Sequence, residues 1–179
     1  MSPPEIVELA LVEMDGILRT GRKMHWRFKP RNGISPAVTR VHGIREQDVA
    51  DAPDIDDVAD DISMLLEDAP IVGHNVRVEL DLLSKELTNW WPAAAIDTLR
   101  LARFLLPGQE KYGLERLGEV LGLGKTAAEI TGGVPHSAPY DAALSALLLA
   151  FLLEPLSEDE RAAALLDADI LANRHGALL

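Results

Sequence analysis

The sequence predicts one α/β domain built on a mixed sheet, because two strands come first and helices and strands then alternate. The apolar run at 6–14 ends at Asp15-Gly16, a strong hairpin signal, and a second strand is expected at 23–29. Neither an internal repeat nor a long linker divides the 179 residues.

Hydrophobic periodicity and helix-stopping residues predict the remaining elements. A loop with one helical turn is expected at 34–44, and a second loop at 124–135. The other expected elements are a helix from residue 55 with Asp54 as its N-cap, strands at 70–72 and 94–97, and helices at 76–87, 98–106, 113–123, 141–153 and 157–173.

Composition restricts the class of protein and of metal site. No apolar run approaches the ~20 residues of a membrane span, and the first residues lack a basic signal-peptide region. The chain has no cysteine, which excludes disulfides and thiolate metal sites and fits a cytoplasmic protein. A metal would therefore be bound by carboxylates, histidine or water, which favours Mg²⁺ or Mn²⁺.

The charge is unevenly distributed. A net charge of −12 argues against a protein that coats long nucleic acids. The segment 19–31 nevertheless holds six of the seventeen lysines and arginines. Two interpretations are open: a solvated strand pair, or a patch that faces phosphates through Arg22 and Lys23.

The expected helix at 76–87 contains two acids with different surroundings. Asp81 is four residues from both Arg77 and Lys85, which predicts an exposed ion-pair stripe. Glu79 lies instead at the edge of the apolar face. It either reaches out to solvent or binds a metal ion or water.

Polar residues also stand where the strand at 70–72 passes into this helix. Gly73 permits a tight turn, and Asn75 is a candidate N-cap. Because open α/β sheets place sites at the carboxyl ends of strands, His74 and Asn75 are also candidate binding residues.

A second group lies near the predicted helix at 141–153. Asp141 stands at its start, where an acid stabilises the helix dipole. His136 lies five residues earlier on a loop rich in glycine and proline. A histidine close to an acid can also form a general base and metal-binding pair.

Taken in order, these segments resemble the DEDDh-type 3′→5′ exonucleases, the family of the epsilon proofreading subunit of DNA polymerase III. The resemblance covers residues 5–153. Its motifs are EIVELALVEMDG at 5–16, His42-Gly43-Ile44, VGHNVRVELDLL at 72–83, Asp97-Thr98-Leu99 with Ala102-Arg103 and Pro107-Gly108, and His136 with Asp141.

The resemblance implies a ribonuclease H-like mixed sheet flanked by helices. It implies hydrolysis of DNA or RNA from single-stranded 3′ ends with Mg²⁺ or Mn²⁺, with Glu79 and Asp141 as metal ligands and His136 as general base. A DNA polymerase is an expected partner. Residues 1–153 would form the exonuclease-like domain, followed by an acidic helical extension at 154–179.

The sequence departs from the family pattern in two places. The family has aspartate where this chain has Glu79, and an aromatic residue where it has Val78. The family's first motif, Asp-x-Glu, lies on a strand that would precede residue 5. We therefore expect this strand to be missing through a late start or truncation, which would leave the strand at 6–14 with an open edge.

Two alternative functions follow from these departures. One is an inactive exonuclease-like domain that binds nucleic acid or a replication or repair partner. The other is an interaction domain without a nucleic-acid role.

Overall fold

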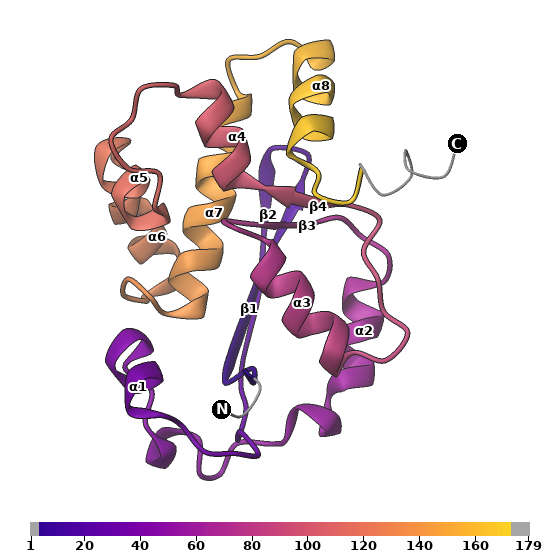
Figure 1. Ribbon diagram of the computed structural model, residues 1–179, viewed down its shortest axis with the longest axis vertical. Helices are drawn as coiled ribbons and strands as arrows, with labels where there is room; N and C mark the ends of the chain where they lie inside the picture. Colours follow the sequence, from indigo (N-terminus) through magenta and orange to yellow (C-terminus); the bar gives the residue numbers. More distant parts are fainter. Residues whose placement is uncertain (1–3, 173–179) are drawn as a thin grey trace.

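The computed structural model describes residues 4–172, except for the side chains of residues 37 and 38. The strands form two separate pairs (Figure 1). Strand β1 (Glu8–Asp15) is antiparallel to β2 (Leu18–Arg27), and β3 (Ile71–Gly73) is parallel to β4 (Ala95–Asp97). The predicted α/β class with both kinds of pairing is confirmed. Within residues 4–172 the two pairs remain separate, because no strand there pairs with both β1 and β3.

Short and medium helices surround the strands (Figure 1). They are α1 (Pro36–His42), α2 (Ala59–Leu66), α3 (Arg77–Glu86), α4 (Thr98–Leu105), α5 (Leu114–Val120), α6 (Gly124–Thr131), α7 (Ala138–Leu153) and α8 (Glu158–Ala168), with 3₁₀ turns at Glu46–Asp48 and Ile55–Asp57.

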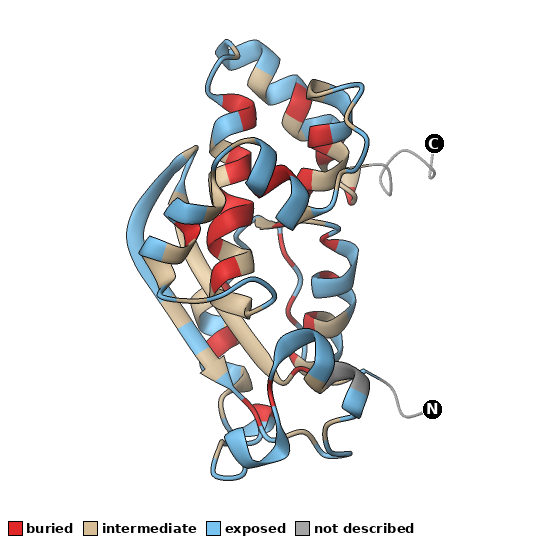
Figure 2. Cartoon of the chain, turned by 90° about the vertical axis from the view of Figure 1, so that its left-hand side faces the viewer, coloured by how far each residue is buried: buried red, intermediate tan, exposed pale blue. Residues whose placement is uncertain are grey.

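Helix α7 connects the two strand pairs. It packs against β1 and β3, and also against α4, α5 and α6. Its sequence is apolar on nearly every side, as expected of a helix enclosed by other elements. Leu144, Leu148 and Leu153 are almost completely buried in it, and Figure 2 shows buried positions gathered in the middle of the molecule.

A second core covers the other face of the hairpin. Leu9 and Leu11 of β1 and Trp26 of β2 pack there against a cluster that includes Leu80 and Leu83 of α3. Val12 and Met14 of β1 instead join the clusters built around α7. Strand β1 is therefore covered on both faces although it is paired along one edge.

The hairpin forms where the sequence predicts it but begins its second strand earlier. Gly16 adopts a φ of +59°, which explains the glycine in the turn. Asp15 pairs directly with Leu18, so β2 starts five residues before the expected boundary. The residues at 18–22 are exposed, and this is why no apolar alternation marks them as strand.

Two local predictions are wrong. Residues 124–131 form helix α6 rather than a loop, because Ala127 is completely buried in a cluster with Tyr140 and Leu144 of α7. Asp54 precedes a 3₁₀ turn and makes no capping hydrogen bond with its side chain. Tertiary packing, rather than local capping, therefore sets the helices in both regions.

The described part of the expected C-terminal extension packs onto the main body. The Asp169 carboxylate accepts hydrogen bonds from the backbone N–H groups of Ala95 and Leu171, both at 2.9 Å. The Ile170 N–H donates to the Ala95 carbonyl at 2.9 Å. Helix α8 is thus tied to β4, while residues 173–179 of the expected extension lie outside the described part.

Across residues 4–172, no helix is both long enough and apolar enough to pass through a lipid bilayer.

We expect Leu148→Ala to lower the free energy of unfolding by about 2–5 kcal/mol, because it opens a cavity in the helix that joins the strand pairs. Leu166→Ala on α8 is the matched control, since Leu166 is 66% exposed whereas Leu148 is 1% exposed. The control should change stability by less than about 0.5 kcal/mol. Urea denaturation of both variants measures the difference, and equal losses would contradict this role of α7.

Candidate functional site

The adjacent ends of β3 and β4 are fixed by a buried carboxylate. Gly73 and Asp97 are register partners, so both strands end side by side. The Asp97 side chain accepts hydrogen bonds from the Asn75 N–H at 2.8 Å and from the Leu99 N–H at 2.9 Å. One carboxylate therefore caps α4 and holds the turn after β3.

Asn75 shapes this turn through its backbone rather than as an N-cap. Its φ is +67°, a left-handed conformation that asparagine adopts more readily than most residues. Val76 occupies the N-cap position of α3 and makes no side-chain capping bond, so the predicted cap is wrong. The Asn75 side chain is exposed at the surface.

Both ring nitrogens of His74 have partners within the protein. Nε2 donates to the Tyr112 carbonyl at 2.7 Å, and Nδ1 lies 3.0 Å from the Thr98 hydroxyl. Burial lowers the His74 pKa, against the opposing effect of the Tyr112 carbonyl, and this favours a neutral ring. The Thr98 hydroxyl also lies 3.2 Å from the Gly73 carbonyl, to which it can donate. Only the ring faces remain for the predicted contact with nucleic acid.

Glu79 stands in the first turn of α3, close to other negative charges. Burial by the surrounding protein raises the pKa of its carboxyl, a backbone N–H partly offsets this, and the charges of Asp97 and Asp141 raise the pKa further. The side chain nevertheless keeps substantial contact with solvent. Glu79 is therefore an accessible carboxylate in a site with excess negative charge.

Asp81 points away from this group. It is exposed, as are Arg77 and Lys85, which confirms the solvated stripe. Among the described residues no ion pair joins the three side chains, so the predicted pairing within the stripe is absent there.

Asp141 and His136 meet at the start of α7. Burial raises the Asp141 pKa, while a hydrogen bond from the His136 backbone N–H and the positive charge of the histidine oppose the increase. His136 adopts a φ of +68°, and its Nε2 lies 3.4 Å from the Glu115 carboxylate on α5. The structure thus brings His136, Asp141 and the charge of Glu79 into one region.

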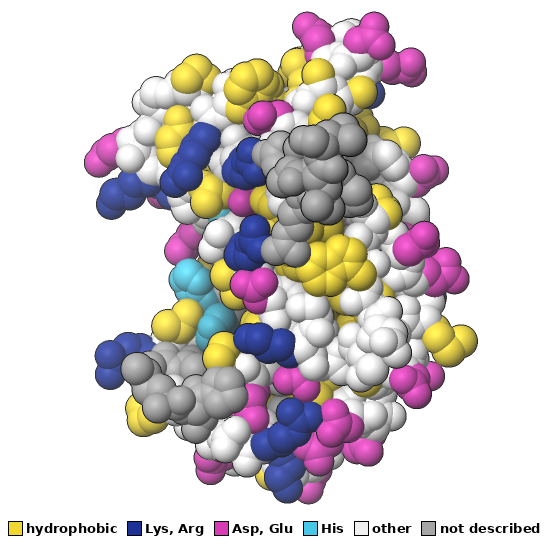
Figure 3. Space-filling model, turned by 45° about the vertical axis from the view of Figure 1, so that its right-hand side comes forward, with side chains coloured by type: hydrophobic (Ala, Val, Ile, Leu, Met, Phe, Trp, Pro, Cys, Tyr) yellow, Lys and Arg dark blue, Asp and Glu magenta, His cyan; other side chains and the backbone are white. Residues whose placement is uncertain are grey.

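A second histidine supports this loop. Nδ1 of His42, at the end of α1, donates to the His136 carbonyl at 3.0 Å. Figure 3 shows histidine side chains gathered at the notch in the left-hand outline of the molecule. Sequence reasoning did not select His42, Glu115 or Asp97 for the site. For Asp97 a signal existed, because it ends a strand beside the one that leads to His74.

Arg22 and Lys23 lie on β2, where each already has a partner. The Arg22 guanidinium is 3.4 Å from the Glu13 carboxylate, and the Lys23 ammonium donates to the Ile130 carbonyl. Both side chains remain exposed. Phosphate binding by this pair, which stays a prediction, would require these weak surface contacts to exchange.

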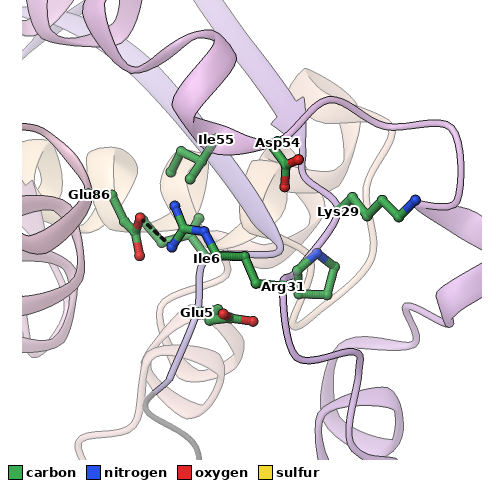
Figure 4. Close-up of a pocket in the computed structure, with 8 residues that line it drawn as sticks. Glu5, Ile6, Lys29, Arg31, Asp54, Ile55 and Glu86 are labelled. Carbon is green, nitrogen blue, oxygen red and sulfur yellow. Dashed lines mark hydrogen bonds and ion pairs between the residues drawn. The ribbon is translucent and has the colours of Figure 1, made fainter.

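The end of the basic segment has a structural role. Arg31 bonds to Asp56 at 2.8 Å and to Glu86 at 3.3 Å, which ties the loop after β2 to the 3₁₀ turn at Ile55–Asp57 and to the end of α3. Figure 4 shows Arg31 directed toward Glu86 in a small recess beside Glu5. These contacts favour a paired surface over a phosphate patch at this position.

The site has the ligand chemistry of a hard cation but few ligands. Glu79 and Asp141 supply carboxylate oxygens, the type that Mg²⁺ and Mn²⁺ prefer. Burial is the main cause of their raised pKa values, and neighbouring carboxylates raise both further. Within residues 4–172, no cluster of three or more acidic or histidine side chains is arranged to hold a metal.

We expect Glu79→Gln to stabilise the protein near pH 7, because the folded state holds the charged glutamate less favourably than the unfolded chain does. The unfolded carboxyl titrates near its ordinary pKa of 4.5, and the folded pKa lies above it. The penalty is absent below pH 4.5 and complete above the folded pKa. The gain in Tm should therefore disappear as the pH falls to 4.5 and below.

Asp81→Asn is the control for this measurement, since Asp81 is an exposed acid on the same helix. Melting curves of both variants and of the wild type between pH 4 and pH 8 make the test. A gain in Tm for Glu79→Gln that persists below pH 4.5 would refute the electrostatic explanation.

Known proteins resemble this chain in sequence and in fold. The sequence model of the RNase T exonuclease family matches residues 2–149. The DNA polymerase III epsilon subunit of Rickettsia felis is 32% identical over 149 residues, which are 79% of this chain and 62% of that protein. The 3′-5′ exonuclease DinG of Bacillus subtilis is 27% identical over 158 residues, covering 86% of this chain and 16% of that protein.

A solved structure also resembles this chain in its fold. Exonuclease X in complex with 5′ overhanging duplex DNA superposes with a TM-score of 0.65 at 27% identity, covering 89% of this chain and 90% of that one. This likeness confirms the predicted ribonuclease H-like fold class. The chain spans about 62% of the length of its Rickettsia relative. From the family match across residues 2–149, we conclude that this chain belongs to the RNase T exonuclease family.

Proposed function

We propose that the protein is a 3′→5′ exonuclease that removes nucleotides from single-stranded ends of DNA or RNA. The observation that carries this proposal is that Asp141, at the start of α7, lies near enough to His136 and to Glu79 of α3 for their charges to affect one another. An accessible carboxylate, a partly buried one and a loop histidine are the groups that metal-assisted hydrolysis of a phosphodiester needs.

Glu79 and Asp141 would hold a hard divalent cation, Mg²⁺ or Mn²⁺. Protein sites commonly bind Mg²⁺ through one or two carboxylates, with water and substrate phosphate completing the coordination. A bound cation would supply charge stabilisation at the phosphate oxygens. It would also offset the burial and the neighbouring negative charge that raise the pKa of both carboxyls.

His136 would act as the general base. Its imidazole accepts a proton from the attacking water as the new P–O bond forms. The bond from phosphorus to the 3′ oxygen of the preceding nucleotide breaks, that oxygen takes up a proton from water to become a hydroxyl, and a nucleoside 5′-monophosphate is released. Glu115, 3.4 Å from Nε2, would stabilise the positive charge that the ring gains.

The substrate would contact surfaces around these groups. The exposed Asn75 side chain and the faces of the His74 ring lie beside Asp97, while Arg22 and Lys23 offer exposed positive charge on β2. By analogy with the epsilon relatives, a DNA polymerase is the proposed protein partner.

We expect Mn²⁺ to raise the Tm of the wild-type chain, because a ligand that binds only the folded state stabilises it by about 2.7 kcal/mol at one hundred times its Kd. Glu79→Gln should lose most of this increase, whereas Asp81→Asn should keep it. Thermal unfolding across a Mn²⁺ titration gives the comparison. A shift of the same size in Glu79→Gln and wild type would remove Glu79 from the proposed metal site.

We expect the protein with Mn²⁺ to shorten a 5′-labelled single strand from its 3′ end and release mononucleotides. His136→Ala should reduce kcat about 10²–10⁴-fold, since it removes the general base. Gel analysis of the shortened products provides the measurement. Products that are equally abundant with wild type and His136→Ala, or absent with both, would count against the proposed activity.

Binding by the basic segment is tested separately. Reversing charge at Arg22 and Lys23 should weaken single-strand binding and flatten its dependence on salt. Lys125→Glu is the matched control, because Lys125 is an exposed cation on α6, outside the hairpin. Unchanged affinity in the Arg22 and Lys23 variants would show that the segment is a paired surface and not a phosphate-binding patch.

A further inference from the structure

The carboxylate of Glu8 on β1 has no role in the predicted fold or in the proposed reaction. Glu8 begins β1, and only 7% of its side chain is exposed. A buried carboxylate is costly unless hydrogen-bond donors or positive charges surround it. The partners of Glu8 therefore indicate what it does.

Three donors from distant parts of the chain meet this carboxylate. Oε2 accepts from the backbone N–H of Ala138 at 2.8 Å. Oε1 accepts from the Arg27 side chain at 3.2 Å and lies 2.9 Å from Nε2 of His25. Burial alone would raise the Glu8 pKa, but the bond from Ala138 and those from the two β2 side chains outweigh it and lower the pKa.

The contact between Glu8 and Ala138 lies at the start of α7, close to the candidate site. Ala138 is the first residue of α7, two residues after His136 and three before Asp141. The first N–H groups of a helix have no partner within it, so an external carboxylate can fix the start of the helix and interact favourably with its dipole. Glu8 thus joins the hairpin to the first turn of α7.

The loop before α7 has a second restraint on its other side. His42 binds the His136 carbonyl, while Glu8 binds the N–H of Ala138. His136 is held with a φ of +68° between these two bonds. Because left-handed backbone is disfavoured for most residues, it persists where neighbouring contacts impose it.

We propose that Glu8 is a positioning residue for the candidate site: by fixing the start of α7 to the hairpin, it determines where His136 and Asp141 lie. This role in catalysis rests on the exonuclease function proposed above. The positioning itself does not, so the two can fail separately.

The chain offers a matched control on the same strand. Glu13 also bonds across to β2, with Thr20 at 2.6 Å and Arg22 at 3.4 Å. Its described hydrogen bonds remain within the hairpin. Glu13→Gln therefore removes a similar charge from β1 without affecting the contact with α7.

Glu8→Gln, Glu8→Ala and Glu13→Gln would be compared with the wild type by NMR. In the Glu8 variants we expect amide exchange at Ala138 to rise about tenfold, as for the loss of a charge-assisted hydrogen bond, and the ring resonances of His136 to shift. Amides in the interior of α7, from Leu144 to Leu152, should keep their exchange rates in Glu8→Gln. Glu13→Gln should change neither signal.

Two results would overturn the proposal. The first is unchanged Ala138 exchange and unchanged His136 ring signals in both Glu8 variants. The second is a uniform rise in exchange along the whole of α7, which would show that Glu8 only stabilises the fold.

Where the wild type cleaves single strands, Glu8→Gln should lower kcat at least about tenfold with little change in KM. A wild type without cleavage would refute the exonuclease function and leave the NMR result to decide on positioning.

Discussion

The structure depends on helix α7, because no backbone hydrogen bond in the described chain joins the hairpin to the β3–β4 pair. In a continuous sheet, ladder bonds fix the relative position of the strands. Here packing provides that restraint: α7 contacts both β1 and β3, and the core around α3 joins Leu9 of the hairpin to Ile71 and Ala95. This explains a helix that is apolar on almost every face, and why charged residues on it are confined to its first turn.

The same helix brings the chemical groups together. Asp141 lies in the first turn of α7, and the loop before it carries His136. Glu79 follows β3 on the opposite side of the junction and is affected by the Asp141 charge. Three restraints then act on this one end of the helix: the Glu8 carboxylate, the His42 ring and the Glu115 side chain. The site is consequently sensitive to the hairpin and to α1, neither of which supplies a proposed metal ligand.

Sequence alone predicted what depends on local pattern. The apolar runs, the Asp15-Gly16 turn and the exposure of Asp81 follow from periodicity and turn chemistry, and each is confirmed. Prediction from the sequence failed where distant contacts determine the structure. Helix α6 is an example, because it forms where Ala127 is buried against α7. The contact between Glu8 and Ala138 was beyond local reasoning for the same reason, since the two residues lie 130 positions apart.

Strand β1 combines two properties that are rarely found together. Both of its faces are covered by side chains, as in a central strand, yet within the described residues it is paired along one edge only. A strand in that environment normally carries a second ladder, because buried backbone groups require partners. Glu79 keeps access to solvent while the surrounding protein raises its pKa. The single-edged β1 and the raised pKa values of Glu79 and Asp141 thus occur together in a region where α7, rather than a shared ladder, packs against both β1 and β3.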